Sequence, residues 1–152
     1  MKLLIVEDDE NKRHQLSELI QEKFPNVSVD MARSLQSGLR TIIKVKYDLI
    51  ILDMTMPTYD ISVDEDGGRP RAYAGREILR QMERRKIFVP VILVTQFDRF
   101  GEGSESITLS EIDAQLFSEH KVNYRGSVFY NPALEEWKTS LFKIINRLME
   151  DE

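Results

Sequence analysis

Five short apolar runs separated by stretches of helical periodicity constrain the fold of this chain more than any other feature. The runs are LLIV (3–6), VSVDM (27–31), LIIL (49–52), VILV (91–94) and SVFY (127–130). Four of the five are continuous rather than alternating, which is typical of strands buried on both faces of a mostly parallel sheet. Such a sheet needs helices on both of its faces, so the chain is expected to belong to the α/β class.

Amphipathic helical patterns occupy the intervals between the apolar runs. Ser34 is a preferred N-cap residue before the second pattern, and Thr108 with Glu111 has the spacing of a capping box before the fourth. Pro132 suits a first-turn position, so the last helix is expected to begin directly after it. The apolar faces of the five helices are Leu16, Leu19 and Ile20; Leu35, Leu39, Ile42 and Ile43; Ile78, Leu79 and Met82; Leu109, Ile112, Leu116 and Phe117; and Leu134, Trp137, Leu141, Ile144, Ile145 and Leu148.

Strand and helix therefore alternate five times, and the economical arrangement is an open, doubly wound (βα)5 sandwich around a parallel sheet. Residues 1–152 are expected to form a single domain, because a chain of 152 residues can bury a core of its own. Two segments are expected to be surface insertions: 58–74, which is acidic and then rich in Gly, Pro and Arg, and 96–106, which carries two glycines.

Composition narrows the setting and the function classes. The chain has no cysteine, which excludes disulfides and thiolate metal sites and favours a reducing cytoplasm. No apolar run approaches the length of a membrane span. The formal net charge of -5 argues against a nucleic-acid-binding domain, because such domains usually carry a basic face.

Acidic side chains follow two of the predicted strands. Glu7 and Asp8 end the first strand, and Asp53 ends the third. Ligands of open α/β sheets bind outside the carboxyl ends of the strands, where the strand order reverses. In the strand order 2-1-3-4-5, the first and third strands are neighbours and the three carboxylates converge. Carboxylate oxygens suit Mg²⁺, and a divalent cation relieves the repulsion between crowded acids.

Thr95 ends the fourth predicted strand, in VILVTQ, and is expected at the same edge of the sheet. A hydroxyl there can donate a hydrogen bond to an anion beside the metal. The pattern therefore predicts a site for a metal and a phosphoryl group, with Asp53 as the candidate nucleophile. Asp9 is interpreted differently, as the N-cap of the first helix, because Asp is a preferred N-cap residue.

These residues resemble the receiver domain of response regulators in two-component signalling, a flavodoxin-like (CheY-like) fold. The matching segments are LLIVEDDENKR, LIILDMTMP, AGREILRQM, PVILVT and FYNP. The resemblance implies that Glu7, Asp8, Asp53 and the backbone carbonyl of Thr55 bind Mg²⁺. It also implies that Asp53 accepts a phosphoryl group from a histidine kinase or phosphotransfer protein, and that Thr95 contacts that group.

The chain departs from the receiver pattern at three places. Receivers carry a lysine just before a proline after the last strand, and this chain has Asn131 there. Asn can form hydrogen bonds but cannot neutralise the charge of a phosphoryl group. The usual aromatic position on the last strand is Val128, which puts the usual coupling between the Thr and an aromatic side chain in doubt. The segments 58–74 and 96–106 also make this chain longer than a typical receiver.

Three functional hypotheses follow. The leading one is a stand-alone receiver without an output domain, which binds Mg²⁺, is phosphorylated on Asp53 and signals through a separate effector protein; it is not expected to be an enzyme. The alternative is a pseudo-receiver, a binding module that works without phosphorylation because Asn131 replaces the lysine. The third is a Mg²⁺-dependent phosphohydrolase, which ranks lower because the sequence offers no convincing general acid or base near Asp53.

The last helix carries an apolar stripe that covers an arc of about 160°, wider than a helix packed on a sheet requires. Two interpretations stay open: a deeply buried helix, or a helix that presents part of its stripe to a partner. The resemblance favours a homodimer through the fourth helix, the fifth strand and the fifth helix. No direct contact with nucleic acid or membrane is expected.

Overall fold

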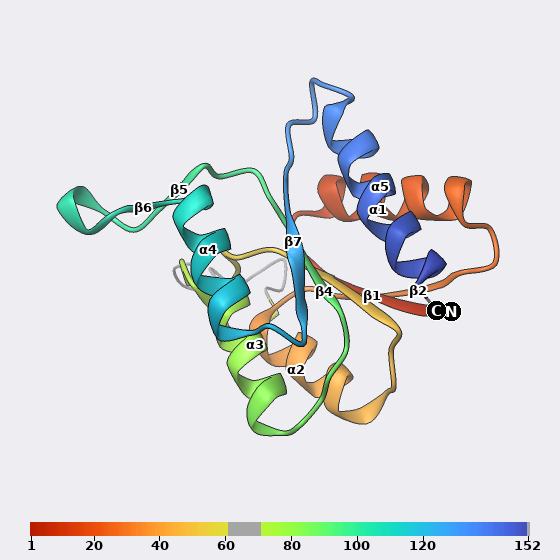
Figure 1. Cartoon of the computed structure of the whole chain (residues 1–152), viewed down its shortest axis with the longest axis horizontal. Helices are drawn as coiled ribbons and strands as arrows, with labels where there is room; N and C mark the ends of the chain where they lie inside the picture. The colour runs from red at the N-terminus through yellow and green to blue at the C-terminus, as the bar shows by residue number, and fades with distance from the viewer. Residues whose placement is uncertain (61–70, 152) are drawn as a thin grey trace.

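A computed structural model describes residues 1–60 and 71–151 of the chain. Its central feature is a parallel sheet of five strands in the order β2-β1-β3-β4-β7 (Figure 1). The strands are β1 (Lys2–Val6), β2 (Ser28–Ala32), β3 (Leu49–Leu52), β4 (Val91–Thr95) and β7 (Tyr124–Phe129). Strand β7 takes the place of the fifth predicted strand, so the predicted fold and the strand order 2-1-3-4-5 are confirmed.

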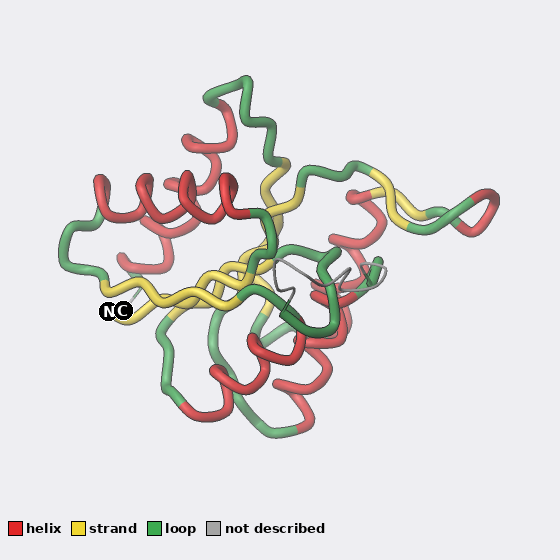
Figure 2. Tube along the Cα trace, turned by 180° about the vertical axis from the view of Figure 1, so that it is seen from behind, coloured by secondary structure: helices red, strands yellow, loops and turns green. Residues whose placement is uncertain are grey.

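Helices cover both faces of the sheet. Two of them, α1 (Glu10–Lys23) and α5 (Glu136–Glu150), pack on one face; α2 (Leu35–Lys44), α3 (Ala74–Arg84) and α4 (Leu109–Glu119) pack on the other (Figures 1 and 2). Successive strand residues point to opposite faces. In β1, Leu4 and Val6 therefore join the core under α2 and α3, while Leu3 and Ile5 join the core under α1 and α5. This two-sided burial explains why the strands read as continuous apolar runs.

The helix starts agree in part with the sequence signals. Asp9 caps α1 by accepting a hydrogen bond from the Lys12 backbone N–H (3.1 Å), as expected. Ser34 and Thr108 likewise cap α2 and α4. The expected start of the last helix is wrong, because α5 begins at Glu136 and not after Pro132.

The residues after β7 form a turn instead of helix. The Asn131 side-chain oxygen accepts a hydrogen bond from the Ala133 N–H (3.0 Å), and the Asn131 carbonyl accepts one from Leu134 (3.0 Å). An Asn that bonds to the backbone two residues on offers an alternative to helix. Leu134 is 49% exposed and lies outside the helix to which its apolar character had assigned it.

The segment 96–106 is not a plain loop. It contains β5 (Arg99–Phe100) and a short 3-10 helix (Gly103–Glu105), and β5 pairs in antiparallel fashion with β6 (Ile107–Thr108). The hairpin projects away from the sheet in both views (Figures 1 and 2). Phe100 is buried in the core and Ile107 on β6 packs against the same core, whereas Arg99 is exposed, so the hairpin is anchored through apolar side chains of both its strands.

The other insertion, 58–74, lies largely outside the described residues, because 61–70 are not described. Near its C-terminal end, Arg71 pairs with Met56 in an isolated antiparallel bridge. Across the described ranges 1–60 and 71–151, no helix is both long enough and apolar enough to span a bilayer.

The wide stripe of α5 is mostly used within the molecule. Trp137, Leu141 and Ile145 are buried against the sheet, and Ile144 packs on the same core at its edge. Phe142 stacks on Phe24, beyond the end of α1, with 5.6 Å between ring centroids. These contacts account for most of the stripe through packing on the sheet and on α1.

Candidate functional site

The acidic residues after β1 and β3 come together because these strands are neighbours in register. Val6 pairs with Leu52, and the Asp53 N–H still donates to the Val6 carbonyl (3.2 Å) beyond the end of β3. Glu7 and Asp53 therefore leave the sheet side by side. One carboxylate oxygen from each of Glu7, Asp8 and Asp53 lies within 4.8 Å of the others.

A lysine that the sequence analysis did not single out lies among these acids. Lys12 on α1 is 1% exposed. Its Nζ lies 2.5 Å from Glu7 Oε2 and 3.0 Å from Asp53 Oδ2, and it donates a hydrogen bond to the Val94 carbonyl at 2.7 Å. The ammonium therefore donates hydrogen bonds to Asp53 and Val94 and forms an ion pair with Glu7.

The start of α1 aims Lys12 inward. Lys12 lies four residues before Leu16 and eight before Ile20, so it shares the buried face of the helix with them. Arg13 holds the same turn in place, because its Nη1 donates to the carbonyls of Glu7 (2.9 Å) and Asp8 (3.1 Å). This spacing is the sequence signal that could have identified Lys12: a lysine on the apolar stripe of an amphipathic helix.

Burial and charge shape the protonation of this pair. Burial raises the pKa of Glu7 to about 9; the Lys12 ammonium opposes that rise, and the Asp53 carboxylate adds to it. For Lys12, burial lowers the pKa, but the carboxylates of Asp53 and Glu7 outweigh that effect and leave it raised. Lys12 therefore stays charged, and the site favours positive charge beside its acids.

Asp53 and Thr95 occupy neighbouring positions at the edge of the sheet. Asp53 is 4% exposed, and its Oδ1 accepts a hydrogen bond from the Met54 N–H (2.7 Å). Thr95 is buried at the end of β4, and its hydroxyl oxygen accepts from the Phe97 N–H (3.2 Å). Thr55 follows in the loop after β3, where its hydroxyl donates to the Ala72 carbonyl (3.2 Å).

Two of the positions that depart from the receiver pattern lie near the end of β7: Val128 within the strand and Asn131 just after it. The Asn131 side-chain oxygen is engaged in the turn before α5. Val128 is buried in the core under α1 and α5, while Phe129, the next residue, is 48% exposed. Among the described residues, the ion pairs of Glu7 and Asp53 are both made with Lys12, so the cation of this site comes from α1 and not from the end of β7.

The acidic cluster fits a hard divalent cation. Its donors are oxygen atoms, which Mg²⁺ prefers, and a metal of this kind needs only one or two carboxylates because it keeps several waters. Asp8 is the most exposed of the three acids and remains accessible while Lys12 contacts the other two. The three predicted carboxylate ligands are thus brought together, and the metal-binding role of these acids and of the Thr55 carbonyl stays a prediction.

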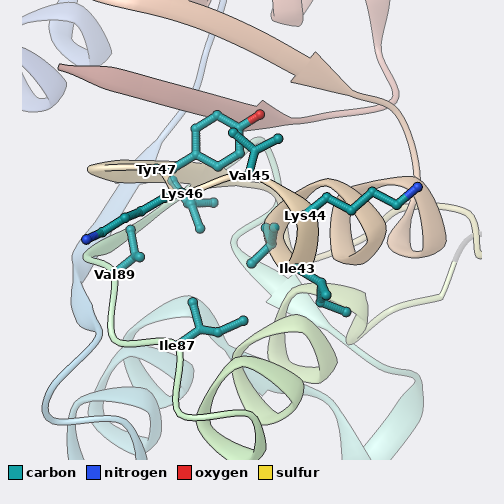
Figure 3. A pocket seen from close by; sticks show the side chains of 9 residues that line it. Ile43, Lys44, Val45, Lys46, Tyr47, Ile87 and Val89 are labelled. Atoms are coloured by element: carbon teal, nitrogen blue, oxygen red, sulfur yellow. The ribbon is translucent and has the colours of Figure 1, made fainter.

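A separate pocket of about 270 Å³ lies at the opposite edge of the sheet, where β3 and β4 begin. Apolar side chains of its wall come from the last turn of α2 (Ile43), from the segment after α2 (Val45) and from the segment before β4 (Ile87 and Val89) (Figure 3). The pocket contains none of the site residues, and in an open α/β sheet ligands bind at the other edge.

An open parallel sheet with acids at the β1–β3 switch point, a threonine at the end of β4 and helices on both faces defines a receiver-type α/β domain. The chain belongs to the response regulator receiver domain family, whose family model matches residues 3–114. Sequence relatives extend the match. The chain is 38% identical over 144 residues to an uncharacterized protein, y4jR, of Sinorhizobium fredii, covering 93% of this chain and 94% of the relative.

A second relative has a more informative name. The Detocs response regulatory protein DtcB of Enterobacter cloacae is 35% identical over 150 residues, covering 97% of this chain and the whole relative. Among solved structures, the response regulator TrrA of Thermotoga maritima, in complex with Mg²⁺-BeF, aligns with a TM-score of 0.59 and 22% identity over 94% of this chain and 97% of that one. A CheY-like receiver of Methanospirillum hungatei aligns with a TM-score of 0.61 and 20% identity over 98% and 94%. These two structural matches support the fold.

Proposed function

We propose that this chain is a phosphoacceptor receiver. In this proposal Asp53 takes a phosphoryl group from a histidine kinase or phosphotransfer protein, and Glu7, Asp8, Asp53 and the Thr55 carbonyl hold Mg²⁺. The observation that carries the proposal is the convergence of three carboxylates on one point at the switch edge of the sheet, with a cation already paired to two of them.

For this phosphoryl transfer, the protein has to position the reacting groups and supply positive charge. A carboxylate oxygen of Asp53 attacks the phosphorus of a phosphohistidine; the P–O bond forms, the P–N bond breaks, and the imidazole leaves with a proton from solvent. Met54 N–H and Lys12 Nζ each bond to one oxygen of Asp53, which fixes the carboxylate for attack. Mg²⁺ held by Glu7, Asp8 and Asp53 would supply positive charge to the transferred group. Thr95 accepts from Phe97, which leaves its own hydrogen to donate to a phosphoryl oxygen.

The phosphorylated domain acts in this proposal by binding a separate effector protein in the cytoplasm, and not by catalysing turnover of a substrate. Support comes from the receiver family of the chain and from the name of its relative DtcB as a response regulatory protein. Side chains on the α4–β7 face, Phe117 and Phe129, are each 48% exposed and offer apolar area for such a contact.

A second candidate function is a pseudo-receiver that binds its partner without phosphorylation. The arrangement of Asn131 favours it, since this residue caps the turn before α5 and carries no charge. The burial of Val128 favours it as well, because no aromatic side chain stands at that position to follow a movement of Thr95.

Intact-mass spectrometry after incubation with Mg²⁺ and acetyl phosphate tests the proposal. Wild type is expected to gain one phosphate, and Asp53→Asn is expected to gain none. Asp48→Asn is the matched control, because Asp48 is an exposed aspartate at the opposite end of the same strand. A folded wild type that takes no phosphate from acetyl phosphate or from a cognate kinase decides for the pseudo-receiver.

A further inference from the structure

Lys12 is a buried cation inside the acidic site, and it comes from an element that the receiver pattern does not use for this purpose. We propose that Lys12 makes the positively charged contact to the phosphoryl group on Asp53, in place of the lysine that Asn131 replaces. The inference rests on the proposed function, since it assigns a residue to the same phosphoryl group.

Charge is the first argument. A phosphoryl group adds about one negative charge to a site that already holds three acids, and Asp53 is 4% exposed. Buried charge is tolerated when it is paired with an opposite charge and hydrogen-bonded. Asn131 cannot supply that charge, and its side-chain oxygen already bonds to Ala133. Among the residues that the structure describes, the cation paired with Asp53 is Lys12.

Position is the second argument. Lys12 Nζ lies 3.0 Å from Asp53 Oδ2, so oxygens of a phosphoryl group bound to this carboxylate fall within reach of the same ammonium. Because the Lys12 ammonium already contacts the carboxylate of Asp53, it needs no large movement to contact the phosphoryl oxygens.

Anchoring is the third argument. The hydrogen bond from Nζ to the Val94 carbonyl (2.7 Å) joins Lys12 to β4 independently of the acids. Lys12 can therefore exchange Asp53 Oδ2 for a phosphoryl oxygen while it keeps Val94 and Glu7 as partners. Such a preorganised donor is the arrangement that stabilises developing charge most effectively.

A purely structural ion pair would use the same contacts, so the test must separate the two roles. Removing a structural cation would disturb the acids and weaken the binding of both Mg²⁺ and the phosphoryl group. Removing a cation that only contacts the phosphoryl group weakens the binding of that group alone. Mg²⁺ binding to the acids is then kept or strengthened, because a competing positive charge is gone.

The experiment compares Lys12→Met and Lys12→Gln with wild type, with Lys23→Met as the control lysine on the exposed end of α1. Two equilibrium titrations are made on each protein: Mg²⁺ alone, and the phosphoryl analogue beryllofluoride in saturating Mg²⁺. Trp137 is the single tryptophan of the chain, and Tyr130 lies between Trp137 and Lys12. The fluorescence of Trp137 therefore serves as the signal in both titrations. The variant Lys12→Gln keeps a neutral hydrogen-bond donor for the Val94 carbonyl, and it replaces Lys12→Met in both titrations if Lys12→Met does not fold.

We expect beryllofluoride to bind Lys12→Met and Lys12→Gln at least tenfold more weakly, the range of a charge-assisted hydrogen bond, while Mg²⁺ affinity is kept. Adding Asn131→Lys to either variant is expected to restore beryllofluoride binding. Unchanged beryllofluoride affinity, a parallel loss of Mg²⁺, or failure of Asn131→Lys to rescue each overturns the inference. If wild type binds neither beryllofluoride nor phosphate, the proposed function itself fails, and this inference falls with it.

Discussion

The replacement of Gly75 by alanine is the most direct test of how α3 packs against the residues that follow β3. Gly75 is the second residue of α3, and its N–H donates to the Met54 carbonyl (2.9 Å). A Cβ at this position would lie 2.6 Å from the Asp53 carbonyl oxygen, 2.9 Å from Leu52 Cδ1 and 3.0 Å from Met54 Cα. Two of these three atoms belong to the backbone directly after β3 and not to a flexible side chain, so the backbone of α3 or of this segment must shift.

The expected cost follows from two opposing effects. Alanine in place of glycine favours a helix by up to about 1 kcal/mol. Overpacking against fixed atoms costs about 1–3 kcal/mol. The clash at Asp53 is severe because its obstructing atom is backbone, so the upper part of that range applies, and Gly75→Ala is expected to lower the free energy of unfolding by about 1–2 kcal/mol.

Gly38 on α2 is the comparison residue. There a Cβ would lie 2.8 Å from Val6 Cγ1, which is a side-chain atom. The variant Val6→Ala removes that obstacle, so Gly38→Ala should cost less in the Val6→Ala background than in wild type. Leu52→Ala should give no comparable relief to Gly75→Ala, because the Asp53 carbonyl remains.

Urea unfolding followed by far-UV circular dichroism measures all of these variants. The reasoning is refuted if Gly75→Ala is as stable as wild type, or if Leu52→Ala relieves it as fully as Val6→Ala relieves Gly38→Ala. A parallel measurement of phosphate uptake on Asp53 shows whether the forced shift of α3 reaches the carboxylate.

Three further predictions concern stability. Ser34→Ala removes the side-chain cap of α2 and should cost about 1 kcal/mol in urea unfolding, whereas a cost near zero would show that the cap is dispensable. Asp113→Ala leaves the hydroxyls of Tyr124 and Ser127 without their acceptor between α4 and β7 and should cost about 1–3 kcal/mol in thermal or urea unfolding. Burial, and then the hydrogen bond to Asp113, raise the pKa of Tyr124, so the folded state holds this proton more tightly than the unfolded state. That stabilisation is complete below the ordinary tyrosine pKa of about 10 and is lost as pH rises above it. Urea midpoints measured from pH 8 to 11 should fall less steeply in Tyr124→Phe than in wild type. The remaining slope comes from the other groups whose pKa values are raised, which are Glu7, Lys12, Tyr47 and Tyr130; equal slopes would contradict the assignment.

Most of the fold could be predicted because its signals are long or strongly periodic. Continuous apolar runs identify strands buried on both faces, and the intervening periodicity identifies the helices that bury them. The hairpin of β5 and β6 was missed because strands of two residues carry no period. The start of α5 was misplaced because Pro132 suits a first turn, while the Asn131 side chain stabilises a competing turn.

The site was predictable where topology alone decides it. Glu7, Asp8 and Asp53 meet because parallel neighbours end at the same edge, which strand order is sufficient to foresee. Lys12 was missed because lysines on amphipathic helices usually lie on the exposed face, and its burial depends on partners that are distant in sequence. Asp53 and Val94 lie 41 and 82 residues away, and only the assembled sheet brings them to α1.

The origin of the cation changes how a signal can leave the site. A lysine after β7 would couple the phosphoryl group to the strand that ends beside α4. Lys12 instead couples it to α1, and its Nζ lies 5.6 Å from the ring of Tyr130, which in turn lies 4.8 Å from Trp137 on α5. If Lys12 carries the phosphoryl contact, phosphorylation acts first on the packed aromatic pair between α1 and α5. The exposed Phe129 on β7 has no comparable link to Lys12 among the described contacts, so the α1–α5 side is where a phosphorylation-dependent change should first be observed.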